Sequence, residues 1–158
     1  MKSKIITKEG YEKLSGELNH LWREIRPEIT KMVAWAASLG DRSDNADYQT
    51  NKQKLREIDR RIRFLEKTLS DIKVVEYDPQ QEGKIYFGAW VTLEDENEKT
   101  LKFRVVGPDE IYGRNDYISI DSPMAKACIR KSVDDEVEVD APFSKQYWHI
   151  TSISYKHL

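Results

Sequence analysis

Two long helical repeats of apolar residues dominate the first half of the chain and leave few ways for it to fold. One runs from about residue 8 to residue 39 and the other from about residue 45 to residue 72. Apolar residues recurring in steps of three and four form one stripe along a helix, and two stripes of similar length pair as an antiparallel hairpin. A helix of about 30 residues reaches roughly 45 Å. The stripes are Leu14, Leu18, Leu21, Ile25, Met32, Trp35 and Leu39, then Tyr48, Asn51, Leu55, Ile58, Ile62, Leu65, Leu69 and Ile72.

Capping residues and one proline predict where these helices begin, bend and end. Thr7 suits the N-cap of the first helix, and Gly40 suits the left-handed position just past its C-terminus. Ser43 or Asp44 suits the N-cap of the second helix. Pro27 removes one backbone hydrogen bond within the first helix, so a kink is expected there.

The predicted tip of the hairpin, residues 40–47, concentrates negative charge. Asp41, Asp44 and Asp47 fall within seven residues. Acidic residues are common in turns and at helix N-termini, which gives them an ordinary explanation. Concentrating carboxylates at the end of a long arm also costs like-charge repulsion, which a cation relieves. Two carboxylates offer an incomplete oxygen shell to Mg²⁺, so further ligands have to come from a partner.

The second helix carries a row of cations beside its apolar stripe. Their spacing of three and four residues places them on one face of the helix. This face has two interpretations: a solvated flank with intrahelical ion pairs, or a track that neutralises successive phosphates of a nucleic acid. The row consists of Lys52, Arg56, Arg60, Arg63 and Lys67.

The pattern changes after Val75, and we expect the domains 1–76 and 84–158, joined by a linker at 77–83. A strand-like run over 85–93 is followed by a charged turn and an alternating strand, which predicts a β-hairpin. A short helix should begin at Pro123, and a bulge is expected between Ile150 and Ile153 because the apolar residues change face there. The predicted class is α+β, a helical hairpin followed by an antiparallel sheet with one short helix.

Charge and cysteine content limit the possible functions and compartments. Residues 1–75 contain 16 Lys and Arg against 12 Asp and Glu, whereas the remainder contains 10 against 16, so the two parts should meet different partners or different faces of one partner. The single cysteine, Cys128, excludes an internal disulfide and is expected to fill the core. No apolar run approaches the length of a membrane span, and we expect a cytoplasmic monomer without membrane contact.

Two stretches of this sequence resemble a known family. Residues 36–48, Ala-Ala-Ser-Leu-Gly-Asp-Arg-Ser-Asp-Asn-Ala-Asp-Tyr, are similar to the tip of the bacterial Gre transcript cleavage factors. Residues 118–125, Ile-Ser-Ile-Asp-Ser-Pro-Met-Ala, resemble the family's second signature. The likeness covers essentially the whole chain, and the Trp-Ala-Ala-Ser-Leu-Gly-Asp-Arg-Ser approach, the linker and the basic row resemble the B-type members.

The resemblance implies a helical arm that enters the secondary channel of RNA polymerase and stimulates Mg²⁺-dependent cleavage of backtracked nascent RNA at its 3′ end. Asp41 and Asp44 would help to hold a Mg²⁺ shared with the polymerase, with none bound stably by the isolated protein. The basic row would hold the extruded RNA. The chain would be an accessory factor rather than an enzyme. An FKBP-like C-terminal domain would dock at the channel rim through Asp121, Ser122 and Pro123.

Other interpretations remain open at this point. The family usually has glutamate at position 44, so a regulator that enters the channel without cleavage is the alternative. The FKBP-like fold also suggests a prolyl isomerase or chaperone, which would need a deep aromatic-lined pocket. A free coiled-coil RNA binder would show RNA affinity without polymerase and a steep salt dependence.

Overall fold

The computed structural model describes residues 2–40 and 45–156, and its contacts divide the chain into two compact units. One unit comprises Tyr11–Ile72, and the other combines Met1–Gly10 with Lys73–Leu158. The N-terminal segment belongs to the second unit because β1 (Ile5–Ile6) pairs in parallel with β2 (Lys73–Val74). The contact division therefore differs from the sequence-based boundary at residue 76.

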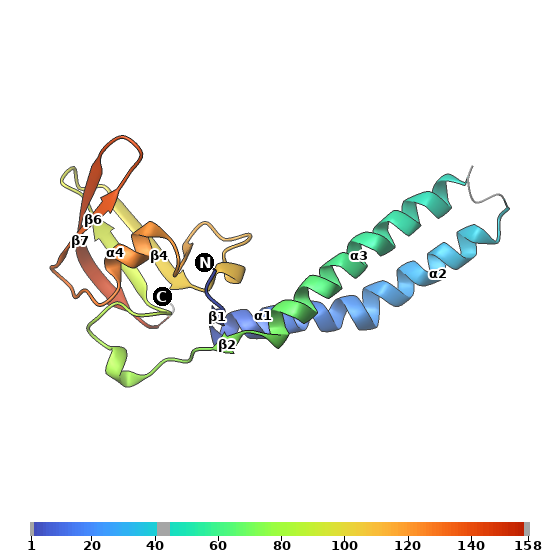
Figure 1. Cartoon of the computed structure of the whole chain (residues 1–158), viewed down its shortest axis with the longest axis horizontal. Helices are drawn as coiled ribbons and strands as arrows, with labels where there is room; N and C mark the ends of the chain where they lie inside the picture. The colour runs from blue at the N-terminus through green and yellow to red at the C-terminus, as the bar shows by residue number, and fades with distance from the viewer. Residues whose placement is uncertain (1, 41–44, 157–158) are drawn as a thin grey trace. The chain divides into compact units, whose positions relative to one another are not determined.

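The first unit is a pair of antiparallel helical segments (Figure 1). Thr7 caps the first helix as predicted, since its Oγ1 accepts the Gly10 N–H at 3.0 Å. The second helix is capped by Asn45, whose Oδ1 accepts the Tyr48 N–H at 3.0 Å, so the predicted cap at Ser43 or Asp44 is wrong. Gly40 has the predicted positive φ, 131°. The segments are α1 (Lys8–His20), the π-helical η1 (Leu21–Ile25), α2 (Arg26–Ala37) and α3 (Ala46–Ser70).

The irregularity predicted at Pro27 takes the form of the π-helical turn η1. The Arg26 N–H bonds to the carbonyl of Leu21, five residues back, and Pro27 lies in the first turn of α2, where a backbone donor is not needed. A π turn contains one more residue than the regular helix, so every later side chain is rotated forward by one position. The first apolar stripe is therefore wrong after Ile25.

This rotation exchanges the buried and exposed residues of α2. Ala36 is fully buried, whereas its predicted seam neighbour Trp35 is 60% exposed. Met32 and Leu39, also predicted in the seam, are exposed as well. Val33 and Ala36 take the places predicted for Met32 and Trp35.

The stripe predicted for α3 is confirmed, because its members are all buried or half-buried. Ile62 and Leu65 are at most 4% exposed. Two ion pairs join α3 to the opposite segment: Arg26 Nε lies 2.8 Å from Asp59 Oδ1, and Arg61 donates two hydrogen bonds to Glu17. The bonds from Arg61 lower the pKa of the Glu17 carboxyl.

A curled sheet with one short helix forms most of the second unit, which confirms the α+β class. The β3–β4 hairpin is present as predicted, although β3 begins at Trp90 rather than Ile85, because Gly88 adopts a positive φ of 91°. Within the five-stranded sheet formed by the described residues, the strand pairs are antiparallel except β4–β5, which is parallel. The order is β5-β4-β3-β7-β6, formed by β3 (Trp90–Glu94), β4 (Thr100–Val106), β5 (Tyr117–Ser119), β6 (Glu136–Asp140) and β7 (Lys145–Ser154), with α4 (Pro123–Cys128) and the 3-10 turns η2 (Pro79–Gln81) and η3 (Pro108–Glu110).

The predicted bulge lies in β7. Thr92 pairs with Ser152, but the next residue of β3, Leu93, pairs with Ile150, so Thr151 is the extra residue. Its hydroxyl donates to the Thr92 carbonyl at 3.2 Å. The bulge allows Ile150 to point into the core while the strand continues in register beyond it.

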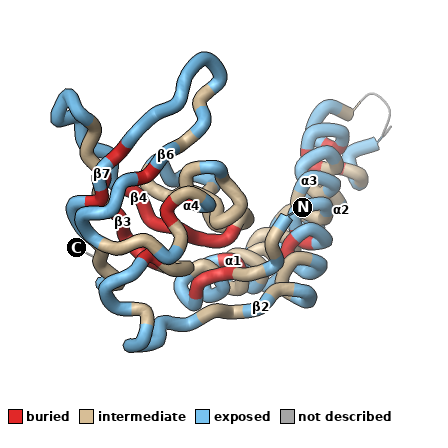
Figure 2. Tube along the Cα trace, turned by 60° about the vertical axis from the view of Figure 1, so that its left-hand side comes forward, coloured by how far each residue is buried: buried red, intermediate tan, exposed pale blue. Residues whose placement is uncertain are grey.

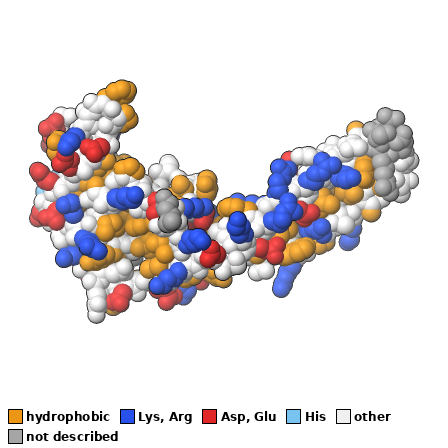
Figure 3. Space-filling view, in the orientation of Figure 1, with side chains coloured by type: hydrophobic (Ala, Val, Ile, Leu, Met, Phe, Trp, Pro, Cys, Tyr) orange, Lys and Arg blue, Asp and Glu red, His pale blue; other side chains and the backbone are white. Residues whose placement is uncertain are grey.

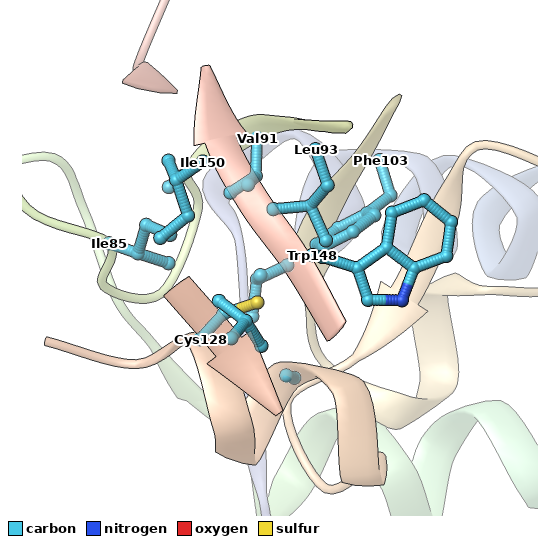
Figure 4. Close-up of a cluster of buried hydrophobic side chains, with 11 residues drawn as sticks. Ile85, Val91, Leu93, Phe103, Cys128, Trp148 and Ile150 are labelled. Carbon is cyan, nitrogen blue, oxygen red and sulfur yellow. The ribbon is translucent and has the colours of Figure 1, made fainter. Parts of the chain in front are cut away.

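A single apolar cluster packs one face of the sheet against α4 (Figure 4). Cys128 is completely buried, as predicted for a core residue, and this burial raises the pKa of its thiol to about 11. In Figure 2 the buried stretches, drawn in red, lie in the strands and along the helices. The labelled members of the cluster are Ile85, Val91, Leu93, Phe103, Cys128, Trp148 and Ile150.

Candidate functional site

The tip of the hairpin is the first candidate site, and its two predicted metal ligands, Asp41 and Asp44, lie outside the described residues. Asp47 is described and stands exposed in the first turn of α3. Within 2–40 and 45–156, no group of three or more His, Cys, Asp or Glu residues could hold a metal ion. The role of Asp41 and Asp44 therefore stays a prediction.

Asn45 joins the ends of the two helices next to this tip. Besides capping α3, it donates from Nδ2 to the Ala36 carbonyl at 2.6 Å, so one side chain binds both helix ends. The same amide gives α2 a partner for a carbonyl near its C-terminus. Sequence reasoning missed this residue, although an asparagine three positions before the first seam residue, Tyr48, is a recognisable N-cap signal.

A polar residue within the seam lies one turn further along α3. Asn51 is 7% exposed and donates to the Asp47 carbonyl at 2.9 Å. Its Oδ1 is buried and has no hydrogen-bond partner among the described residues. The buried amide interrupts the apolar packing close to the tip. It also costs free energy, because its buried oxygen accepts no hydrogen bond from a described residue.

The row of cations on α3 is exposed or half-buried, and blue side chains recur along the hairpin in Figure 3. The Lys52 ammonium lies 5.3 Å from the Tyr48 ring, and Arg56 donates to the Gln53 amide at 3.2 Å. In the described part of the chain, no member of the row forms an ion pair with a carboxylate, whereas Arg26 and Arg61 do. These five side chains can therefore meet an external anion without first breaking an ion pair to any residue that the structure describes.

The predicted docking residues surround the start of α4. Asp121 accepts hydrogen bonds from the backbone N–H of Ser3, at 2.8 Å, and from its hydroxyl, and these bonds lower the pKa of the Asp121 carboxyl. Ser122 caps α4 by accepting the Ala125 N–H at 3.2 Å, and Pro123 is exposed in the first turn. Asp121 thus holds the N-terminal segment in place, and Ser122 holds the start of the helix.

A second anchor of the N-terminal segment was not predicted from the sequence. The Glu110 carboxylate accepts the backbone N–H of Thr7 at 3.0 Å, the Thr7 hydroxyl, and the Gly107 N–H at 2.7 Å. Gly10 is close to the same carboxylate: a Cβ there would lie 2.1 Å from Glu110 Oε1. No short-range sequence signal indicates a contact across more than a hundred residues.

Comparison with known proteins gives the family. The family model described as transcription elongation factor, N-terminal, matches residues 4–74. The family model for the C-terminal part of GreA/GreB matches residues 80–155. The chain belongs to the GreA/GreB family of transcription elongation factors. Among the described residues, no helix is long and apolar enough to cross a membrane.

Curated relatives support the predicted B-type. Transcription elongation factor GreB of Pseudomonas putida is 63% identical over 98% of this chain and 96% of its own length. The GreB of Vibrio vulnificus is 62% identical over 98% of both chains. The crystal structure of Thermus aquaticus Gfh1 shares 31% identity over 97% of this chain and 99% of that chain, with a TM-score of 0.44. The family assignment rests on the sequence matches.

Proposed function

We propose that this protein binds RNA polymerase and stimulates cleavage of backtracked nascent RNA, acting as an accessory to the polymerase in the cytoplasm. The observation that carries the proposal is the near full-length likeness to proteins named GreB. The helical hairpin supports it, because a long arm with a short polar tip suits entry into the secondary channel of the polymerase. The sheet unit would dock at the channel rim through Asp121, Ser122 and Pro123.

In this proposal the tip supplies acidic oxygens to a metal site that the polymerase completes. Asp41 and Asp44 would hold a Mg²⁺ together with carboxylates of the polymerase. Bound Mg²⁺ supplies the activation of water for phosphodiester hydrolysis. Asn45 would fix the adjoining helix ends, so that the two acidic residues approach the RNA from a defined position.

The row of cations would bind the extruded 3′ segment of the RNA. Arginine and lysine at successive turns match a chain of phosphates, and their lack of carboxylate partners in the described part leaves this charge available. The lack of ion pairs in the described part supports the RNA track over the alternative of a flank with intrahelical ion pairs.

The test is cleavage of 5′-labelled RNA in a stalled, backtracked polymerase complex with Mg²⁺. We expect rapid shortening with the parent protein and loss of shortening with Asp41→Asn and with Asp44→Asn. Asp47→Asn is the matched control, since it removes a neighbouring tip charge that the proposal does not use. Polymerase binding is measured in parallel by gel shift.

A parent protein that binds the polymerase yet leaves the RNA uncut would overturn the cleavage proposal and support the non-cleaving regulator. In that case Asp44→Glu, which restores the family's usual residue, should introduce cleavage. RNA binding without polymerase would instead indicate a free coiled-coil RNA binder.

A further inference from the structure

A cavity of about 330 Å³ lies within the unit formed by Met1–Gly10 and Lys73–Leu158. This volume falls in the range of small-molecule sites in proteins. None of the roles assigned to the tip, the cation row or the docking segment uses it. Its wall includes the first turn of α1, Arg104 of β4, and three aromatic residues, Tyr77, Phe87 and Tyr155.

Arg104 gives the cavity a buried positive charge with unused hydrogen-bond donors. The residue is 8% exposed, and its Nε donates to the Gly88 carbonyl at 3.0 Å. Nη2 lies 3.4 Å from Glu9 Oε1, longer than a usual N–H···O bond, and Nη1 makes no hydrogen bond to any described residue. A buried guanidinium with free N–H donors favours binding of an oxyanion, whose oxygens can accept hydrogen bonds from both Nη1 and Nη2.

The N-terminus of α1 adds further donors to the same wall. The N–H groups of Thr7 and Gly10 are taken by Glu110 and by the Thr7 hydroxyl. Those of Lys8 and Glu9 have no hydrogen-bond acceptor in the described part of the chain, and both residues line the cavity. Free N–H groups and the helix dipole make a helix N-terminus attractive to phosphate.

The rings of Tyr77, Phe87 and Tyr155 form much of the remaining wall, which also includes Val75, Gly88 and Glu76, whose Oε1 lies 4.0 Å from Lys8 Nζ. The centroids of Tyr77 and Tyr155 are 5.5 Å apart, with ring planes at 40°. Both hydroxyls already have partners, since Tyr155 donates to the Lys84 carbonyl at 2.6 Å and Tyr77 donates to Glu82 at 2.7 Å. The rings therefore offer apolar surface rather than polar groups, which suits a flat ring.

We propose that this cavity binds a small phosphate monoester that also carries a flat aromatic ring, of the nucleoside monophosphate class. The phosphate would lie between Arg104 and the first turn of α1, with the flat ring against Tyr77 and Tyr155. The Glu9 carboxylate holds the place of one phosphate oxygen in the free protein. Its side chain is 66% exposed, so it can turn into solvent when a ligand binds.

The test is calorimetric titration of the full-length protein with AMP, adenosine and inorganic phosphate as probes. We expect AMP to bind with a Kd of about 1 mM or tighter. Adenosine and inorganic phosphate should each bind at least about tenfold more weakly than AMP. Arg104→Met should weaken AMP at least about tenfold. Glu9→Gln should tighten it about threefold, because a competing negative charge is removed.

Glu12→Gln, on the same helix outside the cavity, is the matched control and should leave AMP affinity unchanged. Circular dichroism shows whether Arg104→Met folds, and the opposite effect expected of Glu9→Gln tests the site without removing Arg104. Absence of AMP binding at about 5 mM would overturn the proposal. So would AMP binding that neither variant changes, or phosphate binding as tight as AMP. None of these results depends on cleavage activity.

Discussion

Glu110 and Thr7, separated by 103 positions in the chain, form a two-point contact in which one carboxylate accepts both the backbone N–H and the hydroxyl of the threonine. The same threonine oxygen accepts the Gly10 N–H, so the N-cap of α1 is itself held by a glutamate from the sheet unit. The start of α1 is thus fixed by tertiary hydrogen bonds as well as by its own cap.

Removing this carboxylate should destabilise the protein. Glu110→Ala leaves the N–H groups of Thr7 and Gly107 without their acceptor, and an unsatisfied buried donor costs about 1–3 kcal/mol. We expect the free energy of unfolding in urea to fall by about 2–4 kcal/mol. Glu96→Ala, in the exposed turn after β3, is the control and should change it by less than about 0.5 kcal/mol. Equal effects of the two variants would contradict the anchor.

The rotation introduced by η1 can be tested with two adjacent residues. Ala36→Asp would bury a charge between α2 and α3 and should destabilise the protein by about 3 kcal/mol or more. Trp35→Asp changes a residue that is 60% exposed and should cost less than about 1 kcal/mol. Chemical denaturation followed by circular dichroism measures both. The reverse order would restore the regular heptad stripe predicted from the sequence.

The contact between Ser3 and Asp121 should make stability depend on pH. Hydrogen bonds from Ser3 hold the pKa of the Asp121 carboxyl below its ordinary value of 3.8, so the native state favours the ionised form. The resulting stabilisation is present above that value and is lost as the pH falls through the lowered pKa. The stability difference between the parent and Asp121→Asn should therefore shrink between about pH 5 and about pH 2. A constant difference across this range would argue against the contact.

The cation row should determine the length of RNA that the protein can handle. Changing Arg56, Arg60 and Arg63 together to Ala removes charge without breaking any ion pair in the described part, so the fold should be kept. We expect the longest released RNA fragments to disappear while polymerase binding stays within about twofold. The double variant Lys84→Ala and Lys99→Ala, in the sheet unit, is the control. Unchanged fragment lengths in the triple variant would exclude an RNA track.

Local patterns predicted most of the secondary structure because their causes are local. The Thr7 cap, the α3 stripe, the β3–β4 hairpin and the bulge at Thr151 all follow from neighbouring residues. Pro27 also predicted an irregularity in the first helix. Its form did not follow, since a kink, a break and a π turn all relieve the missing donor, and only the π turn moves the later stripe by one residue.

Long-range contacts limited the rest of the prediction. The parallel pairing of Ile5–Ile6 with Lys73–Val74 and the Glu110 anchor join segments far apart in sequence, so neither had a local signal. The Arg104 cavity has the same origin, because its walls come from distant segments. Asp41 and Asp44 were found by residue type and resemblance, and they lie outside the described residues.

The π turn also bears on how length variation could be tolerated in this arm. The π turn between positions 21 and 25 contains one residue more than a regular helical turn. This extra residue determines that the face of α2 with Ala36 is buried and that the face with Trp35 is exposed. Deleting a single residue there would bring the bulky tryptophan inward and turn the small alanine out. A one-residue change in length near the middle of the arm would thus alter which side chains the last turns before the tip present to the surroundings.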